Sequence, residues 1–119
     1  PPLQISPLVN RHIEIMYTQL KHECSHLNAH LHRHNIIQDP KCSCHINPES
    51  SFHYLFDCPF YDIQRIILMN RLLDLNIPSF APDILFHPHH HLNHELATQV
   101  QKAVCHYIMY CIIMSSRRF

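Results

Sequence analysis

The residue types best suited to chemistry lie together in one short stretch of the chain, PKCSCHINPESSFHYLFDCP. Within it, three cysteines and one histidine follow the pattern C-x-C-x8-H-x4-C; they are Cys42, Cys44, His53 and Cys58. Thiolate sulfur and imidazole nitrogen are the ligands that zinc prefers, and three cysteines with one histidine fill a tetrahedral structural site with no open position. The sequence therefore predicts a zinc knuckle, a small metal-binding loop with a structural rather than a catalytic role.

The spacing within this stretch leaves an alternative open. Zinc fingers usually place two to four residues between their first two cysteines, whereas a single serine separates Cys42 from Cys44. The alternative is a pair of buried thiols next to an unrelated surface histidine.

Size and composition exclude several classes of protein. A chain of 119 residues is enough for one domain and too short for two ordinary ones. Nine basic and nine acidic residues give no net charge, which argues against a strongly electrostatic nucleic-acid binder. The chain has no glycine, so glycine-rich phosphate loops and dinucleotide-binding fingerprints are excluded.

The N-terminal residues and the cysteine spacing indicate the cellular compartment of the protein. The N-terminal residues do not follow the pattern of a secretory signal, and Cys42 and Cys44 are too close to crosslink separate elements. We therefore expect an intracellular, reducing environment and a protein that is not secreted. No apolar run reaches the ~18 residues of a membrane span, so no membrane partner is expected. Because the chain begins at Pro1 rather than Met, we expect a piece of a longer polyprotein.

Periodic apolar residues predict five helical segments. They cover residues 8–21, 25–34, 61–75, 83–86 and a final stretch that starts at Asn93 or His94. Ser25 is the expected N-cap of the second helix, and Asn35 is expected to end it in the left-handed conformation. The apolar side of the third helix is predicted to consist of Ile63, Ile66, Ile67, Leu72 and Leu73. Three further cysteines in helical patterns are expected to be buried: Cys24, Cys105 and Cys111.

These elements predict a mainly α fold, a small helical domain with a CCHC zinc knuckle inserted between helices. The single domain, 1–119, comprises N-terminal helices (1–40), the knuckle (41–59) and C-terminal helices (60–119). The one expected β feature is a short hairpin over residues 42–51, and His87–His94 is expected to form an exposed loop.

The stretch and its surroundings resemble the zinc-binding region near the C-terminus of reverse transcriptases from non-LTR retrotransposons, a class of transposable element. The likeness covers roughly residues 17–119, and it departs from the family pattern at His45, where the family has glycine. A loop glycine after the third helix is also missing, and Lys21 to Cys24 stand where the family often carries an Arg-Thr-Gly-His-like run. The matching residues are Leu27, Asn28, Leu31, Cys42, Cys44, Glu49, Ser50, His53, Cys58, Pro59 and Arg65, with Val104, Tyr107, Ile108, Ser116, Arg118 and Phe119 in the tail.

The resemblance implies a non-catalytic, zinc-binding accessory domain of a polyprotein that is itself an RNA-directed DNA polymerase. Such a domain would support binding of retroelement RNA or target DNA in a nuclear or cytoplasmic ribonucleoprotein. The residues expected to contact nucleic acid are Lys41, Tyr54, Tyr61 and Arg65, by phosphate pairing and by stacking on unpaired bases.

Two alternatives stand beside this expectation. The tyrosines can instead belong to the small core of the knuckle, and Arg65 can instead cap a carbonyl or pair with Asp62. The second alternative is a zinc-stabilised protein-interaction module that docks on the rest of the polymerase without touching nucleic acid, as the neutral charge balance favours.

Overall fold

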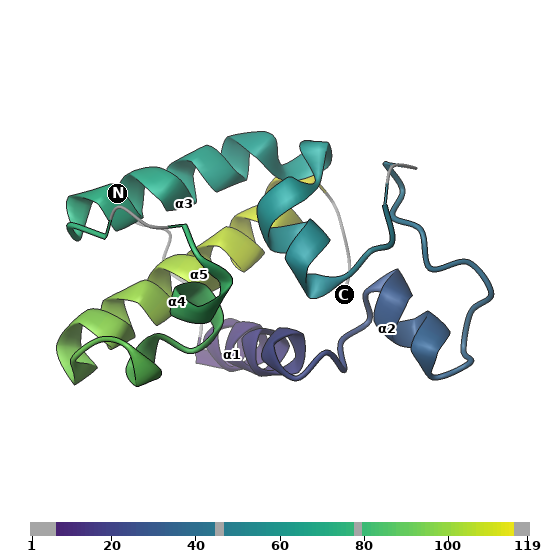
Figure 1. Ribbon diagram of the computed structural model, residues 1–119, viewed down its shortest axis with the longest axis horizontal. Coiled ribbons are helices and arrows are strands. Elements are labelled where there is room, and N and C mark those ends of the chain that lie inside the picture. Colours follow the sequence, from purple (N-terminus) through teal and green to yellow (C-terminus); the bar gives the residue numbers. More distant parts are fainter. Residues whose placement is uncertain (1–6, 45–46, 78–79, 116–119) are drawn as a thin grey trace.

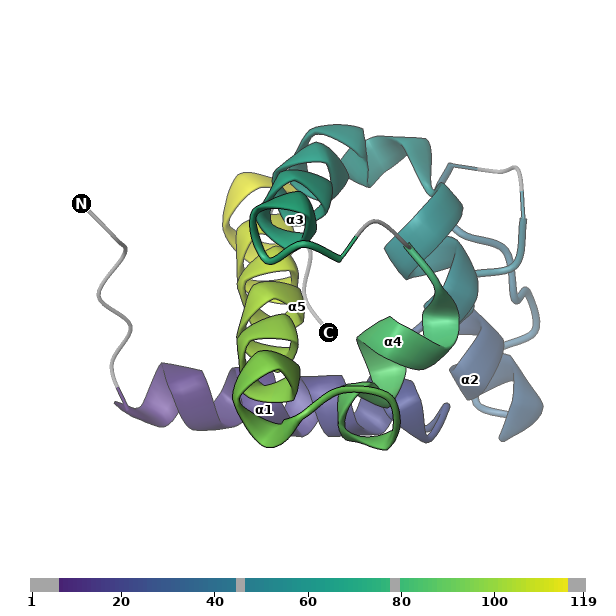
Figure 2. The ribbon, with the colours of Figure 1, turned by 60° about the vertical axis from the view of Figure 1, so that its left-hand side comes forward.

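The longest helix of the structure, α5 (His94–Ser115), lies against most of the other elements. In this computed structural model, which describes residues 7–44, 47–77 and 80–115, α1 (Pro7–Lys21) crosses one side of α5 and α3 (Asp62–Asp74) runs along another (Figures 1 and 2). Two shorter helices are α2 (Asn28–Arg33) and α4 (Pro82–Phe86). The remaining helical turns are a π-helical turn at His53–Asp57 and 3-10 turns at Pro59–Tyr61 and Pro88–His90. The prediction of a mainly α fold is confirmed.

Helix α5 forms the centre of the core. Asn93 caps it, because its Oδ1 accepts a hydrogen bond from the Leu96 N–H at 2.8 Å. The side chains predicted to form its apolar face are Val100, Ala103, Val104, Tyr107, Ile108, Cys111 and Ile112; all are buried except Ile112, which is half-buried. Both the start and the inward face of this helix are therefore confirmed.

Helix α1 packs on α5 through buried Ile13, Met16, Tyr17 and Leu20. The Tyr17 hydroxyl donates a 2.7 Å hydrogen bond to the Leu85 carbonyl, which ties α1 to the short helix α4. After Lys21 the chain turns through Glu23, whose φ of 54° ends the helical path. Cys24 follows this turn and is exposed, so the prediction that it is buried is wrong.

Helix α2 begins later than predicted. Ser25 is not its N-cap: the Ser25 Oγ accepts the Leu27 N–H at 3.1 Å in a turn before the helix. The first helical N–H groups bond instead to a residue far along the chain, with Asn28 donating to the Glu49 carboxylate at 2.9 Å and Ala29 to the Glu49 carbonyl at 3.0 Å. The end of the helix follows the prediction, because Asn35 has a φ of 61°.

Helix α3 is rotated away from its predicted orientation. Its buried residues are Gln64, Arg65, Leu68 and Leu72, whereas Ile63, Ile66 and Leu73 are 67%, 56% and 57% exposed. Of the five residues predicted for the apolar side, Leu72 is buried as expected and Ile67 is half-buried, whereas Ile63, Ile66 and Leu73 face outward. The reason is that the Arg65 guanidinium reaches inward to backbone carbonyls of the preceding turn, and this contact fixes which side of the helix faces the core.

Other predictions have mixed outcomes. The hairpin over 42–51 is present only as one antiparallel bridge between Lys41 and Pro48, and the described residues include no strand. The loop at His87–His94 contains a 3-10 turn with Pro88 buried. His45 and the tail residues from Ser116 onward lie outside the described residues. None of the helices in the described part of the chain has the length and apolar character needed to cross a bilayer.

The rotation of α3 predicts unequal effects of truncation along the helix. Leu68→Ala should lower the free energy of unfolding by about 2–5 kcal/mol, because it removes a buried side chain and leaves a cavity. The matched change at an exposed site, Ile66→Ala, should cost less than about 0.5 kcal/mol. Urea denaturation of both variants measures the difference, and equal losses would show that Ile66 faces the core as the sequence predicted.

Candidate metal centre

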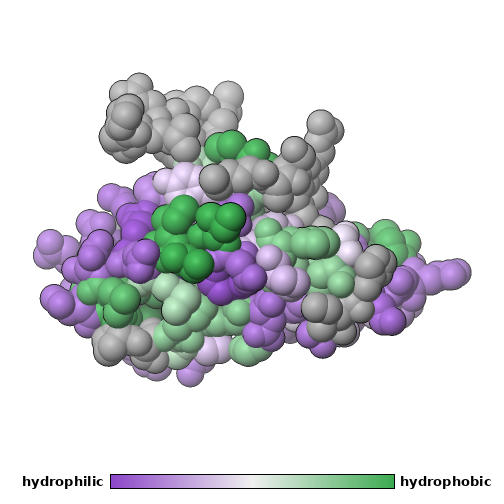
Figure 3. Space-filling view, turned by 90° about the horizontal axis from the view of Figure 1, so that it is seen from above, coloured by the Kyte–Doolittle hydropathy of each residue, from purple (hydrophilic) through white to green (hydrophobic). Residues whose placement is uncertain are grey.

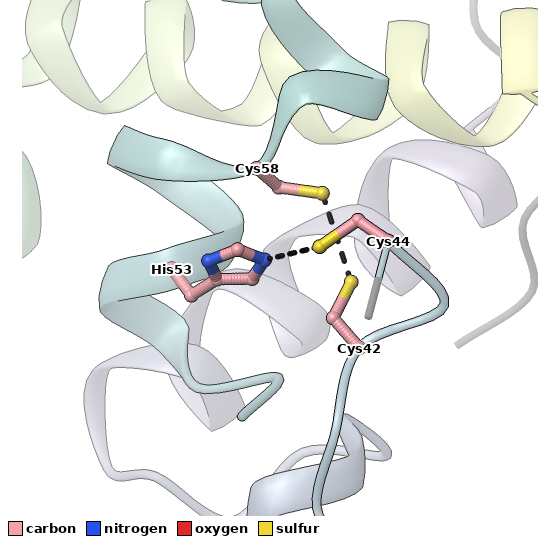
Figure 4. A group of neighbouring side chains, drawn as sticks. All are labelled: Cys42, Cys44, His53 and Cys58. Atoms are coloured by element: carbon pink, nitrogen blue, oxygen red, sulfur yellow. Dashed lines mark hydrogen bonds between the residues drawn. The ribbon is translucent and has the colours of Figure 1, made fainter. Parts of the chain in front are cut away.

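The four residues singled out by the sequence meet at one place in the fold. Their ligand atoms all lie within 4.8 Å of one another, and the side chains point toward a common centre (Figure 4). Cys42 and Cys44 come from the segment before the π-helical turn, His53 begins that turn and Cys58 follows it. Cys42, His53 and Cys58 are buried and Cys44 is half-buried, so these residues could hold a metal ion shielded from water.

Two of the separations within this cluster are close to those of a tetrahedral ion, and the widest reaches 4.8 Å. A centre with Zn–S bonds of about 2.3 Å and Zn–N bonds of about 2.0 Å places its ligand atoms about 3.5–3.8 Å apart. The Cys42 and Cys58 sulfurs are 3.6 Å apart, and the Cys44 sulfur lies a little closer, at 3.2 Å, to the His53 Nε2. Because a disulfide S–S bond is about 2.05 Å long, Cys42 and Cys58 are separate thiols.

The local backbone explains why the first two ligands project to this place. Around the Lys41–Pro48 bridge, the Cys42 N–H bonds to the Asn47 carbonyl at 2.9 Å and the Glu49 N–H to the Pro40 carbonyl at 2.7 Å. The chain therefore turns back on itself between Cys42 and Glu49, and this turn sets the position of both cysteines.

The π-helical turn aligns the other two ligands. His53 and Cys58 are five residues apart, which in an α-helix would place them about 140° apart around the axis. Here the Cys58 N–H bonds to the His53 carbonyl at 2.7 Å, an i to i+5 hydrogen bond that widens the turn. The wider turn brings the imidazole and the thiol to the same side, so the x4 spacing of the motif matches the backbone that carries it.

Burial sets the protonation of the donors. It raises the pKa of the Cys42 thiol to about 12 and also raises that of Cys58, and it lowers the pKa of the His53 imidazole. At neutral pH His53 is then already in the neutral form that binds metals, whereas the two thiols still carry protons. A metal ion must displace those protons, so its binding weakens as the pH falls.

Three polar side chains hold the cluster against the helices. The Glu49 carboxylate accepts the Asn28 N–H of α2 with one oxygen and lies 3.5 Å from the Cys42 sulfur with the other. The Ser51 hydroxyl donates to the Leu20 carbonyl at the end of α1, at 2.8 Å, and lies 3.4 Å from the His30 Nε2. The described residues of the segment 42–58, called the metal-binding turn below for the ion that they could hold, are thus bonded to both N-terminal helices.

The buried imidazole of His30 has a defined tautomer. Its Nδ1 lies 3.1 Å from the Ser25 backbone nitrogen, whose N–H can only donate, so Nδ1 is the acceptor and the proton sits on Nε2. Burial lowers the pKa of His30, which favours this neutral form. Sequence reasoning missed His30 and Ser51 as supports, and among fourteen histidines no local signal distinguishes this one.

Arg65 closes the other end of the metal-binding turn. Its Nε donates to the Leu55 carbonyl at 3.0 Å and its Nη2 to the Cys58 carbonyl at 2.9 Å, while Nη1 pairs with the Asp62 carboxylate at 2.7 Å. The side chain is 7% exposed. Of the roles open to this residue, carbonyl capping and the pair with Asp62 are the ones that the structure contains.

The tyrosines predicted to stack on bases are core residues. Tyr54 and Tyr61 are 1% and 2% exposed, and their rings meet edge to face at 5.1 Å between centroids. The Tyr107 ring of α5 packs against the Tyr54 ring at 5.5 Å between centroids, and the Tyr107 hydroxyl donates a hydrogen bond to the Tyr54 carbonyl. The expectation that Tyr54, Tyr61 and Arg65 contact nucleic acid is therefore corrected, because the fold encloses all three side chains. Lys41, the fourth residue expected to contact nucleic acid, is exposed.

Outside this cluster, no group of three or more metal-ligating side chains converges among the described residues. The histidines of the 87–94 segment form neighbouring pairs instead, with His87 and His90 stacked at 5.3 Å between ring centroids and His89 and His94 at 5.4 Å. Comparison with known proteins adds no further assignment, because no protein family, no curated protein and no solved structure matches this chain.

The contacts of Arg65 predict a structural cost for its removal. Arg65→Leu removes the guanidinium donors from the buried Leu55 and Cys58 carbonyls, of which Cys58 keeps the Tyr61 N–H, and should lower the free energy of unfolding by about 3 kcal/mol. Arg33→Leu removes a guanidinium from an exposed ion pair with Glu23 and should cost less than about 1 kcal/mol. Chemical denaturation compares the two, and a small loss at Arg65 would argue against its role in closing the turn.

Proposed function

We propose that this chain is a zinc-stabilised, non-catalytic accessory domain. The observation that carries the proposal is the convergence of the ligand atoms of Cys42, Cys44, His53 and Cys58 within 4.8 Å, with two of their separations close to those of a tetrahedral ion. Three thiolates with one imidazole favour zinc among the common metals and leave no open position for a substrate. Zinc bound here would link the segment after α2 to the segment before α3.

The composition of the core around the site supports a stabilising role for the ion. Among the described residues between 28 and 52, no aliphatic or aromatic side chain is buried; the buried ones are His30, Cys42, Glu49 and Ser51. This part of the chain therefore lacks a hydrophobic core of its own, and a metal can replace one.

We further propose that the parent protein is a reverse transcriptase of a non-LTR retrotransposon. The support is the match of the C-x-C, Glu-Ser, His-x4-Cys-Pro and Arg positions to that family's zinc-binding region. The structure gives several of these residues linked roles, since Glu49 caps α2 beside Cys42 and Arg65 caps the turn that ends at Cys58.

Within that parent protein, the domain has two candidate roles: it binds nucleic acid, or it binds another protein surface. The burial of Tyr54, Tyr61 and Arg65 removes three of four expected nucleic-acid contacts, and the chain has no net charge. These observations favour the protein-interaction role over direct contact with retroelement RNA or target DNA.

The zinc proposal predicts one tightly bound ion per chain. Cys42→Ser and His53→Ala should each lower the zinc content and loosen the fold, because binding of a structural metal is coupled to folding. Cys24→Ser and His26→Ala change exposed residues outside the cluster and should leave the zinc content unchanged. Elemental analysis and circular dichroism of the purified proteins measure both effects. Wild-type protein that folds fully in a strong chelator and takes up no zinc would contradict the proposal.

The protein-interaction role predicts weak binding to RNA. At physiological salt we expect no specific complex between the zinc-loaded domain and single-stranded RNA in an anisotropy titration. If RNA does bind, the logarithm of the binding constant should fall linearly with the logarithm of the salt concentration. Each phosphate contact should make that slope more negative by about 0.7. A clear salt dependence that Lys41→Ala reduces would favour the nucleic-acid role, with exposed Lys41 as the contact.

A further inference from the structure

The outward face of α3 carries an apolar stripe that nothing in the described chain covers. It consists of Ile63, Ile66, Met69 and Leu73, which are 67%, 56%, 42% and 57% exposed. The surface seen from the α3 side is accordingly hydrophobic in places (Figure 3). Because soluble domains rarely expose contiguous apolar surface, such stripes usually mark interaction sites.

The spacing of the stripe indicates the shape of its occupant. Ile63, Ile66, Asn70 and Leu73 follow a 3-4-3 spacing, which is the a and d pattern of a helix that packs lengthwise on another helix. Asn70 is exposed in the middle of this seam, where one polar residue among apolar ones fixes the register of a helix pair. The 13 residues of α3 are about 20 Å long, enough for a helix of similar length to lie along it.

The charges of this face indicate the chemistry of the occupant. The exposed ionisable residues of α3 are Asp62 and Asp74, one at each end of the stripe. The cations of the helix face elsewhere: Arg65 is buried, and half-buried Arg71 contacts His106 of α5. Asp62 already pairs with the Arg65 guanidinium at 2.7 Å, whereas Asp74 has no ion pair among the described residues. An occupant with basic residues beside its apolar seam would therefore complement the Asp74 end of the stripe.

The same charges disfavour a second copy of this chain as the occupant. In an antiparallel pair of α3 helices that sets Ile63 opposite Leu73, Asp62 lies opposite Asp74. In a parallel pair each aspartate lies opposite its own copy. Both arrangements bring carboxylates together, and like charges across a helix pair are destabilising.

We propose that the α3 stripe is a docking site for an amphipathic helix of a partner protein, with lysine or arginine flanking its apolar seam. This inference extends the protein-interaction role proposed above by naming the surface and the kind of partner. It does not depend on the metal, because the stripe consists of exposed side chains of α3 and includes none of the four candidate ligands.

The test is a titration followed by fluorescence anisotropy. The probe is a labelled designed peptide of about three heptads with Ile and Leu at a and d and Lys at e and g, used at nanomolar concentration so that it stays monomeric. Its counterpart carries Glu at e and g. We expect the zinc-loaded domain to bind the Lys peptide at least about tenfold more tightly than the Glu peptide. Ile66→Asp should weaken the Lys complex at least about tenfold, since it places a charge in the apolar seam.

The matched control is Ile36→Asp, which changes an equally exposed isoleucine in the loop after α2 and should leave the affinity unchanged. Zinc content and helical signal are measured on every variant, so a failure of the metal proposal is seen separately from a failure of docking. Unchanged binding by Ile66→Asp, or equal affinity for the two peptides, would overturn the proposal. A wild-type dimer in sedimentation that Ile66→Asp dissociates would also overturn it, in favour of a second copy.

Discussion

Three cysteine sulfurs and one imidazole nitrogen share a small, largely buried volume, and this convergence is the constraint on which the segment between α2 and α3 depends. The segment that supplies the first two ligands contributes no buried aliphatic or aromatic side chain among its described residues, so hydrophobic burial does little to hold it. Buried polar groups are costly unless they are paired. An ion at the centre would satisfy the four donors together and fasten this segment to the helical core.

Polar contacts between segments that are distant in the sequence hold the four candidate ligands in place. Glu49 bonds to α2, Ser51 to the end of α1, and Arg65 to the turn that carries His53 and Cys58. Each contact joins a side chain to backbone groups at the end of a helix or helical turn. The contact of Arg65 has a second consequence, because turning the guanidinium inward turns Ile63 and Ile66 outward. The orientation of α3 that brings Arg65 to the metal-binding turn thus also leaves the apolar stripe exposed.

Much of this structure could be predicted from local patterns. The α5 helix was predictable because its apolar spacing is regular, and the metal ligands because their residue types and spacing suit one chemistry. The errors share a cause: they occur where a side chain bonds to a residue far along the chain. Glu49 moves the start of α2 away from Ser25, and Arg65 overrides the apolar periodicity of α3. The π-helical turn could not be predicted either, since it is defined by one hydrogen bond between His53 and Cys58.

X-ray absorption spectroscopy at the zinc edge tests the central claim most directly, because it reports the atoms bonded to the metal in the intact protein. The account predicts a first shell of three sulfurs at about 2.3 Å and one nitrogen at about 2.0 Å. A shell made mainly of nitrogen and oxygen, as histidines of the 87–94 segment and water would give, would contradict it.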